Sequence, residues 1–234
     1  ASHQAASLGR EKMRSSPLPE EAVRLRSGAR ARVCRGSPEA KVGVVVLHPW
    51  GPLGGSIHDP HVVAVSRLFG AHGAATARVA FRTGFSCGGS SVEDVVSAAQ
   101  ALLAIANIES VLVVGYSYGS VVAMAAARAI PEAVGWVAIN PPLDVTWALF
   151  LFNGSALLED AKTALPKLLI HATNDQFCAN RSFDDFVAQL PEPKLAVNVK
   201  GASHFDVVRQ IPDALSQFIR QFFSVDDIRS FVRR

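Results

Sequence analysis

Two unbroken apolar runs, KVGVVVLHP (41–49) and SVLVVG (110–115), restrict most strongly what this chain can fold into. A strand covered on both faces of a parallel sheet is apolar throughout, whereas a strand with one solvated face alternates. Each run is followed by a segment with helical spacing, the first starting at Asp59-Pro60 and the second stopped by Pro131. The pattern predicts an α/β fold with a mostly parallel central sheet and helices on both faces.

The rest of the chain continues this alternation. An N-terminal antiparallel hairpin is predicted from the alternating segments on either side of Ser27-Gly28. Ser90 and Glu93 have the spacing of a capping box at the start of a helix. We predict that residues 22–234 form a single domain. The further strands are predicted at 75–81, 135–140, 167–173 and 194–200, and the further helices at 91–106, 182–190 and 212–223.

Charge is distributed unevenly along the chain. Residues 1–41 carry nine Lys/Arg against four Asp/Glu, whereas the remainder carries fourteen against sixteen. The globular part therefore lacks the basic excess of a nucleic-acid surface, and we expect no nucleic-acid partner. Residues 1–21 are predicted to be a flexible basic arm or the remnant of a processed leader.

Cysteine usage and hydropathy bear on the compartment. Cys34, Cys87 and Cys178 are widely spaced and form no C-x-x-C pair, which indicates neither a disulfide framework nor a thiolate zinc site. A reducing compartment, cytoplasm or an organelle matrix, is the expectation. The apolar stretch 136–152 is interrupted by two prolines and an aspartate, so we expect no transmembrane span.

The sequence GYSYG at residues 115–119 joins one of the buried strands to a helix. It matches G-x-S-x-G, in which a serine sits on a sharp turn and small residues let strand and helix pass closely behind it. The free N–H groups of the helix also point at such a turn. Ser117 is therefore either part of a packing turn or an exposed nucleophile.

Two further residues supply what a nucleophilic serine needs. A serine hydroxyl requires a base, and His204 lies just after the last predicted strand. The base in turn requires an acid, and Asp175 lies just after the strand before it. The order Ser117, Asp175, His204 is the order of an α/β-hydrolase triad, and the carboxyl ends of parallel strands meet at one edge of the sheet.

Other residues compete for these roles. Asp144 also follows a strand and is an alternative acid. Asp206 lies only two residues from the candidate base, too close to face its imidazole usefully. Asp184 and Asp185 lie within a predicted helix and are interpreted as a solvated face, and His171 lies inside a strand, where a structural role is expected.

Acyl transfer also requires donors for an oxyanion. The N–H of the residue after the nucleophile, Tyr118, is the first candidate. The second should come from the loop HPWGPLGG, where Pro49 and Pro52 have no N–H. Trp50 is favoured, with Gly51 as the alternative.

The same loop region offers a competing interpretation as a metal site. His48, His58, Asp59 and His61 include no thiolate, and the aspartate has the position of a helix cap, so no metal site is predicted. The segment SCGGSS (86–91) lacks the lysine of a phosphate loop. No cofactor is expected.

These motifs together resemble the α/β-hydrolase superfamily, and within it the small lidless hydrolases. HPWGPLGG resembles their first loop, FRTGFSCGGSS their Phe-Arg turn, PKLLIHATNDQF their acid-bearing strand end and GASHF their ending around the base. The resemblance implies an α/β-hydrolase fold with a minimal cap or none. It also implies Ser117, Asp175 and His204 as nucleophile, acid and base, but it names no substrate.

The apolar segment 147–152 is the candidate acyl pocket, with ordinary core or a partner interface as the alternatives. The sequence favours a serine hydrolase acting on a small-molecule ester or related acyl bond. An acyltransferase or serine peptidase could use the same triad. A structural subunit that contacts a protein partner through the N-terminal arm or through 147–152 is the remaining alternative. The pocket candidates are Trp147, Phe150, Leu151 and Phe152.

Overall fold

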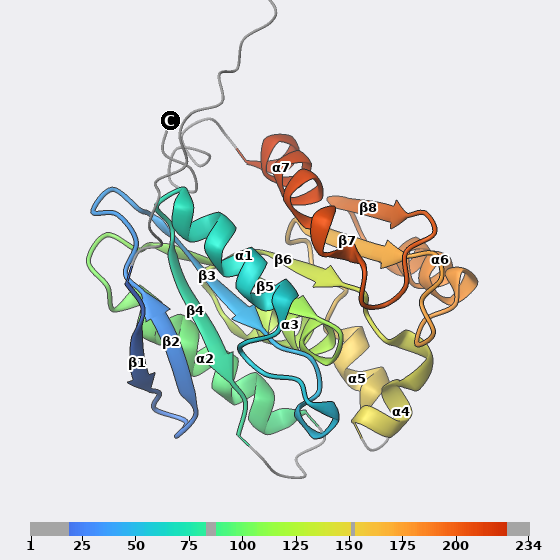
Figure 1. The fold of residues 1–234 in the computed structure, drawn as a ribbon, viewed down its shortest axis with the longest axis horizontal. Helices are drawn as coiled ribbons and strands as arrows, with labels where there is room; N and C mark the ends of the chain where they lie inside the picture. The colour runs from blue at the N-terminus through green and yellow to red at the C-terminus, as the bar shows by residue number, and fades with distance from the viewer. Residues whose placement is uncertain (1–18, 83–87, 151–152, 224–234) are drawn as a thin grey trace, which may run out of the picture.

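The structure is a computed structural model that describes residues 19–82, 88–150 and 153–223 (Figure 1). Its strands are β1 (Glu21–Arg24), β2 (Arg30–Cys34), β3 (Val42–Leu47), β4 (Ala75–Ala80), β5 (Ser110–Tyr116), β6 (Ala133–Ile139), β7 (Lys167–Ala172) and β8 (Lys194–Val199). Its helices are α1 (Pro60–Ala71), α2 (Gly89–Leu103), α3 (Tyr118–Ala129), α4 (Thr146–Leu149), α5 (Gly154–Glu159), α6 (Asn180–Gln189) and α7 (Ile211–Phe222), with 3₁₀ turns η1 (Gly51–Leu53), η2 (Leu143–Val145) and η3 (Val207–Arg209).

The described strands form one sheet in the order β1-β2-β4-β3-β5-β6-β7-β8. The pairs β1–β2 and β2–β4 are antiparallel, and every other neighbouring pair is parallel. The predicted opening hairpin is confirmed, and Gly28 occupies a left-handed conformation (φ 91°) in its turn. The mostly parallel sheet predicted from the unbroken apolar runs is also confirmed.

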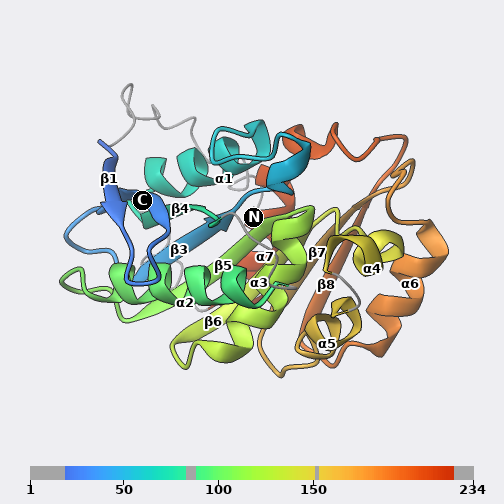
Figure 2. The same ribbon diagram turned by 90° about the horizontal axis from the view of Figure 1, so that it is seen from below.

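The apolar runs are unbroken because each face of the sheet has its own core. Along β5, Val111 and Val113 pack into one hydrophobic cluster, whereas Leu112 and Val114 pack into the other. Helices α2, α3 and α6 cover the first face and α1 and α7 cover the second (Figures 1 and 2). A polar residue anywhere in the middle of this strand would be buried on one face or the other.

Helix starts show one confirmed prediction and one error. Asp59 caps α1 by accepting a hydrogen bond from the N–H of His61 at 2.8 Å. The capping box predicted at Ser90 and Glu93 is wrong, because α2 begins at Gly89, two residues earlier than predicted, with Gly88 as its cap (φ 89°). Glu93 instead pairs with Arg82 at 2.8 Å.

Between β6 and β7, the residues that the structure describes form only η2, α4 and α5, each of six residues or fewer. This arrangement agrees with the expectation of a minimal cap over the carboxyl ends of the strands. Among the described residues, none of the helices is both long enough and apolar enough to cross a bilayer.

The first residues that the structure describes are anchored to the sheet. Glu20 forms an ion pair with the buried Arg78 of β4, and β1 begins at Glu21. Arg78 also donates to the main-chain oxygen of Ile57 at 2.5 Å. The domain therefore includes the last two residues of the predicted arm, and the other arm residues up to 18 lie outside the described part of the chain.

Candidate active site

Ser117 occupies the turn between β5 and α3 with a backbone conformation that side-chain-bearing residues rarely adopt (φ 54°, ψ −123°). Its N–H donates to the main-chain oxygen of Ile139 at 2.9 Å, which ties the turn to the end of β6. Strained backbone of this kind persists only where the surroundings hold it in place.

Two glycines make this turn possible. A Cβ on Gly115 would lie 2.0 Å from the main-chain oxygen of Gly119, and a Cβ on Gly119 would lie 2.7 Å from the main-chain oxygen of His48. Real Cβ atoms do not approach backbone this closely. The first turn of α3 can therefore pass directly against β5 and the end of β3, which brings Ser117 beside the loop after β3.

The three residues predicted from strand ends lie in hydrogen-bonding contact. His204 Nε2 is 2.9 Å from Ser117 Oγ, and His204 Nδ1 is 2.6 Å from Asp175 Oδ2. The side chains of His204 and Asp175 are almost fully buried. Because the carboxylate faces Nδ1, the neutral imidazole carries its proton there and presents the lone pair of Nε2 to the serine.

The competing aspartates have other partners. Asp144 accepts a hydrogen bond from the N–H of Ala179 at 2.7 Å, at the start of α6. Asp206 accepts from the hydroxyl of Ser203 within its own loop. Asp175 is oriented by a second contact, since its Oδ1 accepts from the N–H of Phe177 at 2.7 Å.

The loop after β3 is held by a buried histidine. His48 Nδ1 is 2.5 Å from the main-chain oxygen of Pro49, and its Nε2 accepts from the N–H of Phe81 at 3.2 Å. Burial lowers the pKa of His48 below its ordinary value of 6.5. Trp50 follows in this loop, and its main-chain oxygen accepts from the N–H groups of Leu53 and Gly55.

Comparison with solved structures identifies the architecture. A serine hydrolase without a lid from Xanthomonas campestris superposes with a TM-score of 0.73 at 22% identity, covering 90% of this chain and 99% of that one. A serine hydrolase homologue from Coxiella burnetii gives 0.69 at 19% identity over 88% and 98%. The chain has the α/β-hydrolase fold. Est1E from Butyrivibrio proteoclasticus agrees, with a TM-score of 0.71 at 13% identity over 87% and 98% of the two chains.

Sequence comparison gives two further similarities. Residues 150–231 match the family model described as PhoPQ-activated pathogenicity-related protein, which is less than half of the chain. An uncharacterized protein of Rickettsia prowazekii is 27% identical over 184 residues, which are 72% of this chain and 73% of the relative.

Two residues that bond to the main chain of His204 were missed by sequence reasoning. The Tyr116 hydroxyl and the Asn140 side-chain amide both donate to the main-chain oxygen of His204, at 3.0 and 2.7 Å. Burial, followed by the charges of Asp59 and Asp175, raises the pKa of Tyr116, so its phenol stays protonated. Their positions in the sequence could have pointed to them, because Tyr116 ends β5 and Asn140 directly follows β6, at the same edge of the sheet as Ser117.

The candidate acyl-pocket residues fall into different environments. Phe150 is fully buried and stacks on the ring of Tyr118 at 4.7 Å, so its ring belongs to the core. Trp147 is 62% exposed on α4. Leu151 and Phe152 lie outside the described residues.

Two of the residues considered as metal ligands, Asp59 and His61, contact each other. His61 Nδ1 lies 3.0 Å from Asp59, and its ring stacks on Tyr116 at 4.0 Å. Within the described part of the chain, no three His, Cys, Asp or Glu side chains are grouped so that they could hold a metal ion. His171, expected to be structural, is buried against Phe183 and lies 2.8 Å from the amide oxygen of Asn180.

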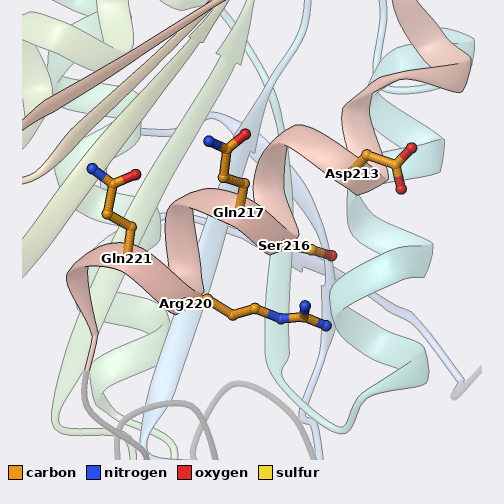
Figure 3. Close-up of a pocket in the computed structure, with 5 residues that line it drawn as sticks. All are labelled: Asp213, Ser216, Gln217, Arg220 and Gln221. Carbon is orange, nitrogen blue, oxygen red and sulfur yellow. The ribbon is translucent and has the colours of Figure 1, made fainter. Parts of the chain in front are cut away.

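A shallow hollow on the outer face of α7 lies apart from these residues (Figure 3). Its polar lining is the solvated side of an amphipathic helix whose other side packs on the sheet. The lining residues are Asp213, Ser216, Gln217, Arg220 and Gln221.

The contacts of His48 predict a pH effect on stability. Below about pH 6.5 the unfolded chain takes up a proton that the folded chain resists, because burial disfavours the charged imidazole and lowers the pKa of His48. The added proton on Nε2 would also face the Phe81 N–H. The free energy of unfolding is therefore expected to fall as the pH is lowered through this value. Denaturant titrations at pH 7.5 and 5.5 should give a smaller difference for His48→Gln than for the wild type, and equal differences would contradict this role.

Proposed function

We propose that this protein is a serine hydrolase that cleaves a carboxylic ester or related acyl bond. The observation that carries the proposal is the hydrogen-bonded chain Ser117–His204–Asp175, with the serine on a strained turn at the carboxyl end of a parallel strand. An unreactive serine needs neither a base at 2.9 Å nor a strained backbone. The α/β-hydrolase fold supports the proposal.

In the proposed reaction, Ser117 Oγ forms a bond to the carbonyl carbon while its proton moves to His204 Nε2. The bond to the leaving oxygen then breaks, and His204 returns the proton to that oxygen, releasing an alcohol and leaving an acyl-enzyme. A water molecule repeats the attack, giving its proton to His204, and the carboxylic acid leaves as Ser117 regains a proton. Asp175 stabilises the imidazolium that forms in each half.

The oxyanion formed in each half is assigned to two main-chain donors, the N–H groups of Tyr118 and Trp50. Tyr118 is the first residue of α3, whose N-terminal N–H groups have no partner within the helix. The loop carrying Trp50 starts at His48, whose main-chain oxygen abuts Gly119. Donors of this kind lower the barrier by about 3–4 kcal/mol each.

An uncharged, apolar small-molecule ester fits the surroundings of the base. Phe177 and Phe205 contact the His204 ring edge to face, at 4.8 and 5.2 Å. Phe205, Trp147 and Leu53 are large apolar side chains that the structure leaves exposed, and each follows the carboxyl end of a parallel strand. The acyl group of the substrate is assigned to Phe177 and Phe205 beside the His204 ring, with the exposed Trp147 as a further candidate.

A fluorophosphonate probe tests the proposal, because it labels only an activated serine. The wild type should be labelled with loss of esterase activity on p-nitrophenyl esters, and Ser117→Ala should show neither labelling nor activity above about 10⁻⁴ of the wild type. Peptide mapping should place the label on Ser117. An unlabelled wild type, or equal labelling of Ser117→Ala, would sink the proposal.

A further inference from the structure

The position of a catalytic imidazole depends on its main chain as well as on its ring contacts. His204 lies in the loop between β8 and η3, which carries few regular main-chain hydrogen bonds. The Asn174 N–H donates to the main-chain oxygen of Ala202, and the His204 N–H donates to the side-chain oxygen of Gln176 at 3.3 Å. Gly201 of the same loop also bonds to Thr173 and Asn174, but these bonds do not reach His204 itself.

Two buried donors converge on one atom of the loop. The Tyr116 hydroxyl and the Asn140 amide both reach the main-chain oxygen of His204, at 3.0 and 2.7 Å. A carbonyl oxygen has two lone pairs, so both are used. Tyr116 is 2% exposed and Asn140 is fully buried, which means that water cannot replace either donor without opening the core.

The two donors are themselves firmly placed. Asn140 has a left-handed backbone (φ 46°), its N–H donates to Ile170 at 2.8 Å, and its side-chain oxygen accepts from the N–H of Ala172 at 2.9 Å. Tyr116 directly precedes Ser117, and its ring stacks on His61. The ends of β5, β6 and β7 are thereby joined to the loop that carries the base.

We infer that Tyr116 and Asn140 are positioning residues that set the distance between His204 and Ser117 by clamping the His204 main chain. The inference rests on the proposed function, since it assigns these residues a part in that same reaction. Tyr116 links the base to the residue adjacent to the nucleophile. Asn140 links it to Ala172, three residues before Asp175 in the chain. The hydrogen bonds of Tyr116 and Asn140 therefore fix the positions of Ser117, Asp175 and His204 relative to one another.

The test compares Tyr116→Phe and Asn140→Gly with Thr76→Val. Phenylalanine keeps the stacked ring and loses only the hydroxyl, and glycine accepts the left-handed backbone while it loses the amide. Thr76 is the matched control, because valine at this position also removes one buried hydroxyl bond, the bond to Ser66 at 3.1 Å. Within the described part of the chain, no hydrogen bond of Thr76 or Ser66 involves His204. Steady-state kinetics, fluorophosphonate labelling rates and unfolding midpoints are measured for each.

Tyr116→Phe should lower kcat and the labelling rate about 3–10-fold, and Asn140→Gly about 10–100-fold, with KM changed less than about twofold. Thr76→Val should lose stability while keeping kcat within about twofold. A merely structural role would lower unfolding midpoints and leave rates per folded molecule unchanged in all three variants. Wild-type labelling at Ser117 with wild-type rates in Tyr116→Phe and Asn140→Gly overturns this inference alone, whereas an unlabelled wild type overturns the proposed function and this inference with it.

Discussion

Replacing Asp175 with asparagine is expected to lower kcat for ester hydrolysis by about 10⁴-fold while leaving KM nearly unchanged. The carboxylate faces His204 Nδ1 at 2.6 Å, whereas an amide can turn its NH₂ group toward that atom. The imidazole would then carry its proton on Nε2, where it cannot accept the proton of Ser117. Steady-state kinetics with p-nitrophenyl esters measure the loss.

Asp144→Asn is the matched control for this change. Asp144 follows the preceding strand of the sheet and accepts from the N–H of Ala179, a bond that an asparagine oxygen retains. The kcat of the Asp144→Asn variant should stay within about threefold of the wild type. Changes of this kind at the surface or at a helix cap alter the free energy of unfolding by about 1 kcal/mol or less. A larger loss in Asp144→Asn than in Asp175→Asn would reverse the assignment of the acid.

Gly115→Ala is expected to destabilise the fold by about 3–5 kcal/mol, a large part of the stability of a domain of this size. The added methyl would lie 2.0 Å from the main-chain oxygen of Gly119 and 2.6 Å from the N of Ser120. These are backbone atoms, so no side-chain rotation relieves the contact, and α3 must shift away from β5. Denaturant unfolding followed by circular dichroism measures the change.

Gly70→Ala provides the control with the opposite sign. Gly70 lies in α1, and a Cβ there would meet nothing within 4 Å. Alanine loses less conformational entropy than glycine in a helix, so this variant should gain about 0.5–1 kcal/mol. Equal effects of the two substitutions would show that the close approach at Gly115 does not limit stability.

The hydrophobic periodicity of the sequence was enough to predict most of the fold. The apolar runs of β3 and β5 predicted a sheet covered on both faces, because alternate side chains of a doubly covered strand enter two separate cores. The positions of Ser117, Asp175 and His204 could be predicted to meet for a related reason. Parallel strands present their carboxyl ends at one edge, so residues just after them converge.

Local signals were less informative where a distant contact competes with them. Ser90 and Glu93 have capping-box spacing, but Gly88 reaches a left-handed conformation and Glu93 bonds to Arg82, so the helix starts earlier. Phe150 lies in a segment without clear periodicity, which gave no means of telling a pocket wall from core. Its burial against the Tyr118 ring was decided by how α3 packs.

The sequence by itself determined the alternation of strands and helices, the sharp turn at Ser117 and the order of the three residues, because these depend on local spacing and on the rules of parallel sheets. Only the tertiary structure decided which donors hold the main chain of His204. Tyr116 and Asn140 lie 88 and 64 residues from His204 in the chain, and a hydrogen bond to a main-chain oxygen places no demand on the partner's side chain. Such a contact leaves no mark in the spacing of either segment, so it appears only when the loop is folded against the strand ends.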